Sequence, residues 1–342
     1  MSDITGAHDP SGPTGHLPNF VGEKSQIEDP KMNRVLAHTG VKYPIVQAPM
    51  GWIARSQLAS AVSNAGGLGV IETSSGEVET CMGEIARMRE LTDKPFGVNL
   101  PLLFIREPRI VDLVARSGVK FVTTSAGSPA KLLPTLKAAG LIVYHVVPNL
   151  SSALKAADAG VDGLIVEGGE GGGFKNPDDV STLVLLQGVR ERTDVPIIAA
   201  GGICDGRGMA AAFALGAEGI QMGTRFVSAA ESPVHANYKQ AIIDADDTGT
   251  VMLNRKSTPC VRALKTERAK AIDREGSFDR AIFGSVKNVY FGGDMEASLA
   301  LAGQTVGLIH EVLPVSDIIQ RTVSGFHAIR RAQWERSAQG EF

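Results

Sequence analysis

Short apolar segments alternate with amphipathic segments along most of the chain. The apolar segments show no regular polar alternation, which is typical of parallel strands that are covered on both faces. The segments between them carry apolar residues at helical spacing, and several end in a glycine, as helices often do. The pattern predicts strands over 44–50, 67–72, 96–100, 121–124, 142–147, 163–167, 196–200 and 219–223, and helices over 56–65, 78–91, 109–116, 129–139, 151–159, 178–192 and 208–215.

This succession of strand–helix units predicts an α/β fold, a (β/α)8 TIM barrel over residues 33–231. A doubly wound sheet is the alternative, but it would need a Gly-x-Gly-x-x-Gly fingerprint after its first strand. The turn after the first predicted strand reads Gln47-Ala48-Pro49-Met50-Gly51-Trp52 and carries no such fingerprint. The barrel is therefore favoured.

The two ends of the chain differ from this central region. Residues 1–32 are rich in Gly, Pro, Asp and Ser, which predicts a flexible N-terminal arm. Residues 232–342 are more polar, and they are predicted to form a smaller, mainly helical C-terminal extension that acts as a lid over the barrel mouth or as a small second lobe. The last predicted helix, about residues 316–336, is amphipathic and could dock on the barrel or on a second subunit of a homodimer.

Composition excludes several classes of protein. The 342 residues are 43% hydrophobic and carry a formal net charge of −3, so there is no basic excess to neutralise a nucleic acid. The three cysteines form no closely spaced pair, which argues against a zinc site or a disulfide framework. No segment has the features of a signal peptide or of a membrane-spanning helix. We therefore expect a cytoplasmic protein that acts on a small molecule, without a metal, a nucleic acid or a membrane as partner.

Glycine clusters follow the sixth, seventh and eighth predicted strands, at 168–173, at 201–202 and at 223. Glycine at the end of a strand lets a ligand approach the backbone closely, and exposed backbone amides favour a phosphate. In phosphate-binding barrels, the loops after strands seven and eight often hold that phosphate. The glycines predict a phosphate-bearing cofactor over the end of the barrel, although tight turns without a ligand would also use glycine.

Five segments in this order resemble the nitronate monooxygenase (2-nitropropane dioxygenase) family: residues 47–51, 64–69, 95–100, 198–202 and 222–226. That family binds FMN in a TIM barrel with a helical extension. Its relatives include flavin-type enoyl-ACP reductases, an NADH:quinone reductase, and flavin enzymes that act on steroid-ring acyl-CoA esters. The resemblance extends over about residues 33–320.

The resemblance implies FMN as the cofactor and assigns residues to it by position. Ala48, Pro49, Met50 and Gly51 are expected along the isoalloxazine ring. Asn99 is expected near the ring and Glu167 near the ribityl chain. The remaining expected contacts are small residues that line the cofactor or hold its phosphate: Gly172, Gly173, Ala200, Gly201, Gly202, Gly223 and Thr224.

One position departs from the family pattern. Members that oxidise nitronates carry a Gly-Gly-His sequence after the sixth strand, whereas this chain has Phe174 in place of the histidine. A phenylalanine cannot transfer a proton. His145, which would point into the barrel mouth or into the barrel core, and Glu170 are the candidate catalytic groups. The alternative for Glu170 is a loop carboxylate that caps backbone amides.

Other side chains near the predicted mouth allow two interpretations each. Trp52 and Phe174 could form an apolar wall of the substrate pocket, or they could simply pack. Lys175 could bind an anionic substrate or be solvated. The basic residues within 262–270 could receive the phosphates of an acyl-CoA, or they could form the solvated face of a helix.

These observations predict an FMN-dependent oxidoreductase that resembles nitronate monooxygenase and oxidises alkyl nitronates or a related small organic substrate. The first alternative is a reductase of quinones or of enoyl or acyl-CoA esters, with NAD(P)H as electron donor. The second is a flavin-binding module without catalytic activity.

Overall fold

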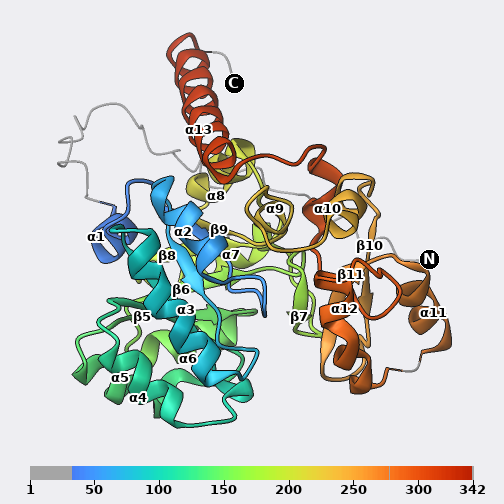
Figure 1. The fold of residues 1–342 in the computed structure, drawn as a ribbon. Helices are drawn as coiled ribbons and strands as arrows, with labels where there is room; N and C mark the ends of the chain where they lie inside the picture. Colours follow the sequence, from blue (N-terminus) through green and yellow to red (C-terminus); the bar gives the residue numbers. More distant parts are fainter. Residues whose placement is uncertain (1–32, 277, 341–342) are drawn as a thin grey trace, which may run out of the picture. The chain divides into compact units, whose positions relative to one another are not determined.

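The structure is a computed structural model that describes residues 33–276 and 278–340, so the predicted arm at 1–32 lies outside the described residues. Eight parallel strands form one sheet in the order β1-β9-β8-β6-β5-β4-β3-β2 (Figure 1). The two end strands also meet, because Gln47 N donates to Leu68 O at 3.0 Å and Leu68 N donates to Ile45 O at 2.8 Å. The predicted barrel is thereby confirmed. Its strands are β1 (Ile45–Gln47), β2 (Gly69–Ile71), β3 (Phe96–Pro101), β4 (Phe121–Ser125), β5 (Ile142–Val147), β6 (Gly163–Glu167), β8 (Ile197–Ala200) and β9 (Gly219–Met222).

Helices follow the strands as the apolar spacing predicts. Glycines end several of them in the left-handed conformation, for example Gly66 at φ 93° and Gly160 at φ 90°. The barrel helices are α2 (Ser56–Asn64), α3 (Val78–Leu91), α4 (Arg109–Arg116), α5 (Leu133–Ala138), α6 (Leu150–Asp158), α7 (Thr182–Arg190), α8 (Gly206–Ala214) and the short α9 (Thr224–Val227), with 3-10 turns η1 (Leu102–Phe104) and η2 (Pro129–Lys131).

Strand alternation divides the buried residues of the barrel into two sets. One cluster fills the barrel interior and includes Val70, Phe121, Tyr144 and Ile198. A larger cluster lies between the strands and the surrounding helices. Because successive side chains of a strand point to opposite faces, each strand contributes to both clusters.

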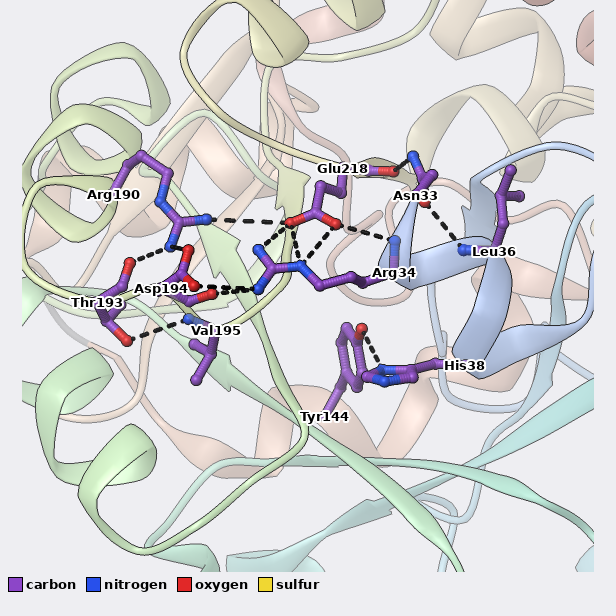
Figure 2. A network of polar contacts seen from close by, with 10 residues as sticks. All are labelled: Asn33, Arg34, Leu36, His38, Tyr144, Arg190, Thr193, Asp194, Val195 and Glu218. Carbon is purple, nitrogen blue, oxygen red and sulfur yellow. Dashed lines mark hydrogen bonds and ion pairs between the residues drawn. The ribbon is translucent and has the colours of Figure 1, made fainter. Parts of the chain in front are cut away.

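Helix α1 (Arg34–Thr39) lies at the amino ends of the strands. Its Val35 joins the interior cluster, and its His38 Nδ1 lies 3.0 Å from the hydroxyl of Tyr144. Figure 2 shows the side chain of Arg34 facing the carboxylate of Glu218, to which its Nε is bonded at 3.0 Å. Glu218 immediately precedes β9, so these contacts fasten α1 to the end of the barrel opposite the predicted cofactor site.

A small sheet that the sequence analysis missed joins the extension to the loop after β6. Strands β10 (Thr250–Leu253), β11 (Cys260–Leu264) and β7 (Gly173–Lys175) pair in antiparallel fashion in the order β10-β11-β7. These strands are short, and buried Arg262 breaks the apolar pattern of β11. Most of the extension is helical, as predicted: α10 (Ala236–Ile243), α11 (Glu267–Glu275), η3 (Arg280–Ser285), α12 (Val286–Tyr290), η4 (Gln304–Leu308) and α13 (Val315–Ala338).

The long C-terminal helix α13 docks on the barrel through α8. Phe326 and Phe213 meet edge to face with ring centroids 5.0 Å apart. Gly206 allows a close approach, because a Cβ there would lie 2.4 Å from the backbone nitrogen of Phe326. Docking on the barrel is therefore confirmed, whereas the predicted homodimer stays a prediction. None of the described helices has both the length and the apolar character needed to cross a bilayer.

Candidate active site

The glycine clusters lie at the carboxyl ends of the strands, which is the functional end of a TIM barrel. Gly201 and Gly202 follow β8 and have φ angles of 85° and 72°, a conformation that other residues rarely adopt. Gly201 is also tightly packed, since a Cβ there would lie 2.9 Å from Thr182 Oγ1. The backbone conformation alone therefore explains why these two positions are glycine, without a ligand.

Gly223 is different. Its φ of −104° is open to any residue. A Cβ added there would meet only Ala48 Cβ at 3.6 Å and Met50 Sδ at 3.9 Å, which are ordinary contacts. Neither the backbone nor the packing of the described residues explains glycine at this position. A ligand group that approaches the backbone beside Gly223, Ala48 and Met50 would explain this glycine, as the resemblance implies for FMN.

The interior face of the barrel also offers polar groups near the carboxyl ends of the strands. Asn99 Oδ1 accepts hydrogen bonds from Thr123 Oγ1 at 2.9 Å and from Ser125 Oγ at 3.4 Å. These bonds orient the Asn99 amide so that its nitrogen remains able to donate to another acceptor. The structure thus brings Asn99 to the interior near the carboxyl end of β3.

Gln221 is a residue that the sequence analysis did not single out. It precedes Gly223 by two positions, so strand alternation directs both toward the same face. Its Oε1 is buried and has no donor within the described residues. A buried acceptor without a partner is costly, and a ligand donor would satisfy it. The signal in the sequence was a lone polar residue in the apolar strand that leads to the glycine.

Glu167 and Lys175 form an ion pair below the strand-six glycines. The side chain of Lys175 is only 4% exposed, and its Nζ also donates to the carbonyl of Gly168 at 3.4 Å. A Cβ at Gly171 would lie 2.3 Å from the Glu167 carboxylate and 2.5 Å from the Lys175 ammonium. The expectation of a solvated or substrate-binding Lys175 is therefore wrong, because this ammonium is already paired and holds the glycine loop.

Glu170 has the capping role that the sequence left open. Both carboxylate oxygens accept from the backbone nitrogen of Thr182 at 3.0 Å, and one also accepts from Thr182 Oγ1 at 2.9 Å. Thr182 is the first residue of α7. These bonds fix the glycine loop beside Gly202, whose added Cβ would meet the Glu170 side chain at 3.5 Å. The structure supports a positioning role and offers no contact for proton transfer.

The expectation that His145 points into the barrel is wrong. Tyr144 belongs to the interior cluster, whereas Val143 and Val147 belong to the outer one, so the alternation of β5 directs His145 toward the helices. Its Nδ1 lies 2.8 Å from Thr124 Oγ1, and the residue is 4% exposed. Burial lowers the pKa of His145 to about 4. It is a neutral residue of the outer layer and is separated from the predicted cofactor.

The structure gives Trp52 and Phe174 different neighbours. Phe174 is 45% exposed and contacts Phe104 and Phe283, with ring centroids 5.2 Å and 5.5 Å away. Trp52 has an unusual φ of 61°, and Lys287 Nζ lies 5.8 Å from the centroid of its ring. Phe174 therefore contributes to an exposed aromatic surface built from η1, β7 and η3. Trp52 lies against a side chain of α12.

Comparisons with known proteins identify similar sequences. The nitronate monooxygenase family profile matches residues 33–109 and 105–325. A "(3aS,4S,5R,7aS)-5-hydroxy-7a-methyl-1-oxo-octahydro-1H-indene-4-carboxyl-CoA dehydrogenase" of Rhodococcus jostii is 36% identical, with 73% of this chain and 70% of that protein covered. A probable nitronate monooxygenase of Staphylococcus saprophyticus is 32% identical, with 68% and 79% covered.

Solved structures extend the comparison. FabK from Thermotoga maritima superposes with a TM-score of 0.83 at 39% identity, covering 88% of this chain and 98% of that one. Nitroalkane oxidase from Streptomyces ansochromogenes superposes with a TM-score of 0.79 at 24% identity, covering 87% and 99%, and at that identity it shows the shared fold alone.

Proposed function

The chain belongs to the nitronate monooxygenase family of flavin-dependent oxidoreductases, and from that premise we propose that it uses FMN to oxidise or reduce an apolar organic substrate, with an acyl-CoA-type substrate favoured. The proposal of FMN as the cofactor rests on the surroundings of Gly223. This residue has neither a conformational nor a packing reason to be glycine, since a Cβ there would meet only Ala48 and Met50 at ordinary contact distances. FMN would supply a carrier for two electrons.

The residues of the chain would bind and orient the two molecules. Gly201, Gly202, Gly223 and Thr224 would hold the phosphate, while Asn99 and Gln221 would offer a donor and an acceptor from the barrel interior. Glu170 and the Glu167–Lys175 pair would keep the strand-six loop in place. All three of these charged side chains have partners within the described residues, so they position the site and do not exchange protons with a substrate.

The preference for an apolar substrate rests on Phe174. It takes the position of the expected histidine, and its ring lies beside Phe104 and Phe283 on an exposed surface. Such a surface binds flat or aliphatic groups and excludes water from them. The relative from Rhodococcus jostii acts on a fused-ring carboxyl-CoA by its name, and this supports an acyl-CoA-type substrate for the present chain.

Nitronate oxidation is the second candidate. The family profile and the relative from Staphylococcus saprophyticus favour it. Nitronates arrive already deprotonated, so the missing histidine does not exclude them. NAD(P)H as electron donor, a cytoplasmic location and a homodimer stay predictions from the sequence.

Absorbance spectroscopy separates these candidates. The purified protein should be yellow, and the flavin released by denaturation should be FMN. A colourless protein that takes up no added FMN would reject the proposal. Anaerobic mixing with NADH, NADPH, a saturated acyl-CoA and propyl-2-nitronate then shows which donor bleaches the flavin bands. Bleaching by nitronate alone favours the second candidate, and yellow protein that no donor bleaches favours the flavin-binding module.

The Phe174→His variant tests the departure itself. If the absent histidine limits nitronate oxidation, nitronate turnover should rise in this variant. The acyl-CoA reaction should weaken, because the apolar surface is interrupted. Unchanged rates with both substrates would show that Phe174 does not select between them.

A further inference from the structure

The extension contains a polar hollow of about 420 Å³ that the proposed site does not use. It lies beside β10 and β11 and is open to solvent. Its volume is within the range of small-molecule sites, about 300–1,000 Å³. Three cations and two carboxylates lie among its lining residues, together with one amide: Arg255, Arg262, Lys265, Asp247, Asp273 and Gln304.

Arg262 is the buried charge of this hollow. The residue is 4% exposed, its Nε donates to the carbonyl of Gly169 at 2.8 Å, and its Nη1 lies 3.4 Å from Thr250 Oγ1. Its one ion pair within the described residues is with Asp179, at the long distance of 4.0 Å. A buried guanidinium with so distant a counter-charge is costly, and an anion in the hollow would compensate it. The expectation that this basic run is the solvated face of a helix is therefore wrong for Arg262, which belongs to β11.

Arg255 and Lys265 complete the positive side of the hollow. Both are exposed, and neither forms an ion pair with another described residue. Asp247 and Asp273 are likewise without an ion pair in the described part of the chain. Cations bind phosphates, whereas carboxylates accept hydrogen bonds from ribose hydroxyls. A ligand that carries both groups fits this combination better than a simple anion does.

The hollow adjoins the predicted phosphate site through neighbouring residues. Gln304 lines the hollow, and its backbone nitrogen donates to the carbonyl of Glu170 at 2.9 Å. The preceding Gly303 donates its backbone N–H to Thr224 Oγ1 at 2.9 Å. Arg262 faces the hollow and also holds Gly169 of the strand-six loop. A molecule bound in the hollow would therefore lie next to the phosphate end of the cofactor site.

We propose that this hollow binds the adenosine-diphosphate end of the second substrate, with Arg255, Arg262 and Lys265 on its phosphates and the two carboxylates on its ribose. This proposal rests on the proposed function, because the favoured acyl-CoA-type substrate carries such an end, as NAD(P)H also does. Pyridine dinucleotides and acyl-CoAs share this chemistry. Either one would lie extended, with its nucleotide in the hollow and its reactive end directed toward the barrel mouth.

Isothermal titration calorimetry on the yellow holoprotein tests the site without turnover. The probes are ADP, 2′,5′-ADP and 3′,5′-ADP, which represent NADH, NADPH and coenzyme A. We expect at least one of them to bind, and the tightest probe identifies the source of the nucleotide. In the double variant Arg255→Gln, Lys265→Gln the dissociation constant should rise roughly tenfold or more, as the loss of charge-assisted bonds to phosphate implies.

The matched control is Lys256→Gln, which removes an exposed cation next to Arg255 but outside the lining. It should leave the binding of the probe within about twofold, and the flavin absorbance of every variant should match that of the starting protein. Arg262 is left unchanged because it also holds Gly169. Yellow protein that binds none of the probes overturns the proposal, and so does an equal loss of binding in the control. A colourless preparation instead counts against the FMN proposal.

Discussion

Replacing Gly223 by alanine distinguishes a glycine required by a ligand from a glycine required by the fold. The added methyl group would contact Ala48 Cβ and Met50 Sδ at 3.6 Å and 3.9 Å, without a clash. The φ of −104° is one that alanine adopts without strain. A Gly→Ala change at such a site typically stabilises a protein by about 0.4–1 kcal/mol, because the unfolded chain loses freedom. The apoprotein should therefore melt at the same temperature or up to about 4 °C higher.

The affinity for FMN should fall in the same variant. Under the proposed function, the methyl group would stand between the phosphate of FMN and the backbone at position 223. Losing one hydrogen bond to a charged group costs about 1.5–3 kcal/mol. That loss corresponds to a rise in the dissociation constant of roughly 10- to 100-fold. Stability and affinity should thus change in opposite directions.

The assay combines thermal unfolding of the apoprotein with titration of apoprotein by FMN, followed through quenching of flavin fluorescence. Gly69→Ala is the control, because a Cβ there would lie 2.0 Å from the carbonyl oxygen of Ala59 and should destabilise the apoprotein strongly. The reasoning is refuted if the melting temperature of Gly223→Ala apoprotein falls by several degrees. It is also refuted if its affinity for FMN is unchanged.

Three further variants, one of them with a matched control, test the roles of charged and titratable residues. The pKa of His145 in the folded protein is about 4, against an ordinary value near 6.5, so between these values the unfolded chain binds a proton that the folded chain does not. The native protein therefore loses about 2 kcal/mol of stability between pH 7 and pH 4.5. Urea unfolding at both pH values should show that His145→Gln removes this loss, with turnover unchanged. Glu218→Gln should lower the free energy of unfolding by about 1 kcal/mol in the same urea titration, because it weakens the bonds to Arg34. The control is Arg192→Gln, which breaks an exposed ion pair with Glu191 and should change that free energy by less than about 0.5 kcal/mol. Glu170→Gln should weaken FMN binding a few-fold without moving the pH profile of turnover, since the carboxylate holds Thr182; a lost pH limb would instead indicate a catalytic Glu170.

The barrel could be predicted because its local signals agree with its packing. The strands are apolar on both faces, and glycines such as Gly66 and Gly160 mark the ends of helices through their positive φ. The sheet of the extension gave no such signal. In β11 all five residues are buried, including Arg262, so no exposed polar face marks the strand. Strand β7 has only three residues, which lie within a glycine-rich loop. Those strands form by pairing with distant segments, which the local sequence does not predict.

For the candidate site, sequence reasoning is strongest where the backbone itself would bind the ligand. Glycines at the ends of strands indicate a phosphate site because the chemistry of the backbone amide is independent of side-chain direction. For the remaining residues, a role in the site depends on the direction in which the side chain points. His145 lies on a predicted strand, but only the packing of Val143 and Val147 reveals that it faces the helices. The inward direction of Gln221 likewise follows only from the packing of its neighbours Ile220 and Met222, which face the helices.

Strand alternation also explains how Phe174 is accommodated where the resemblance leads us to expect a histidine. In β7, Phe174 lies opposite Val261 of the small core of the extension, and its ring reaches Phe104 and Phe283. The next residue, Lys175, points to the other face and pairs with Glu167. The segment therefore joins an apolar contact on one face to a buried ion pair on the other, and together they fasten the glycine loop between barrel and extension. A histidine at position 174 would face the aromatic surface in this arrangement. Under the proposed function, position 174 serves apolar recognition and offers no group for proton transfer.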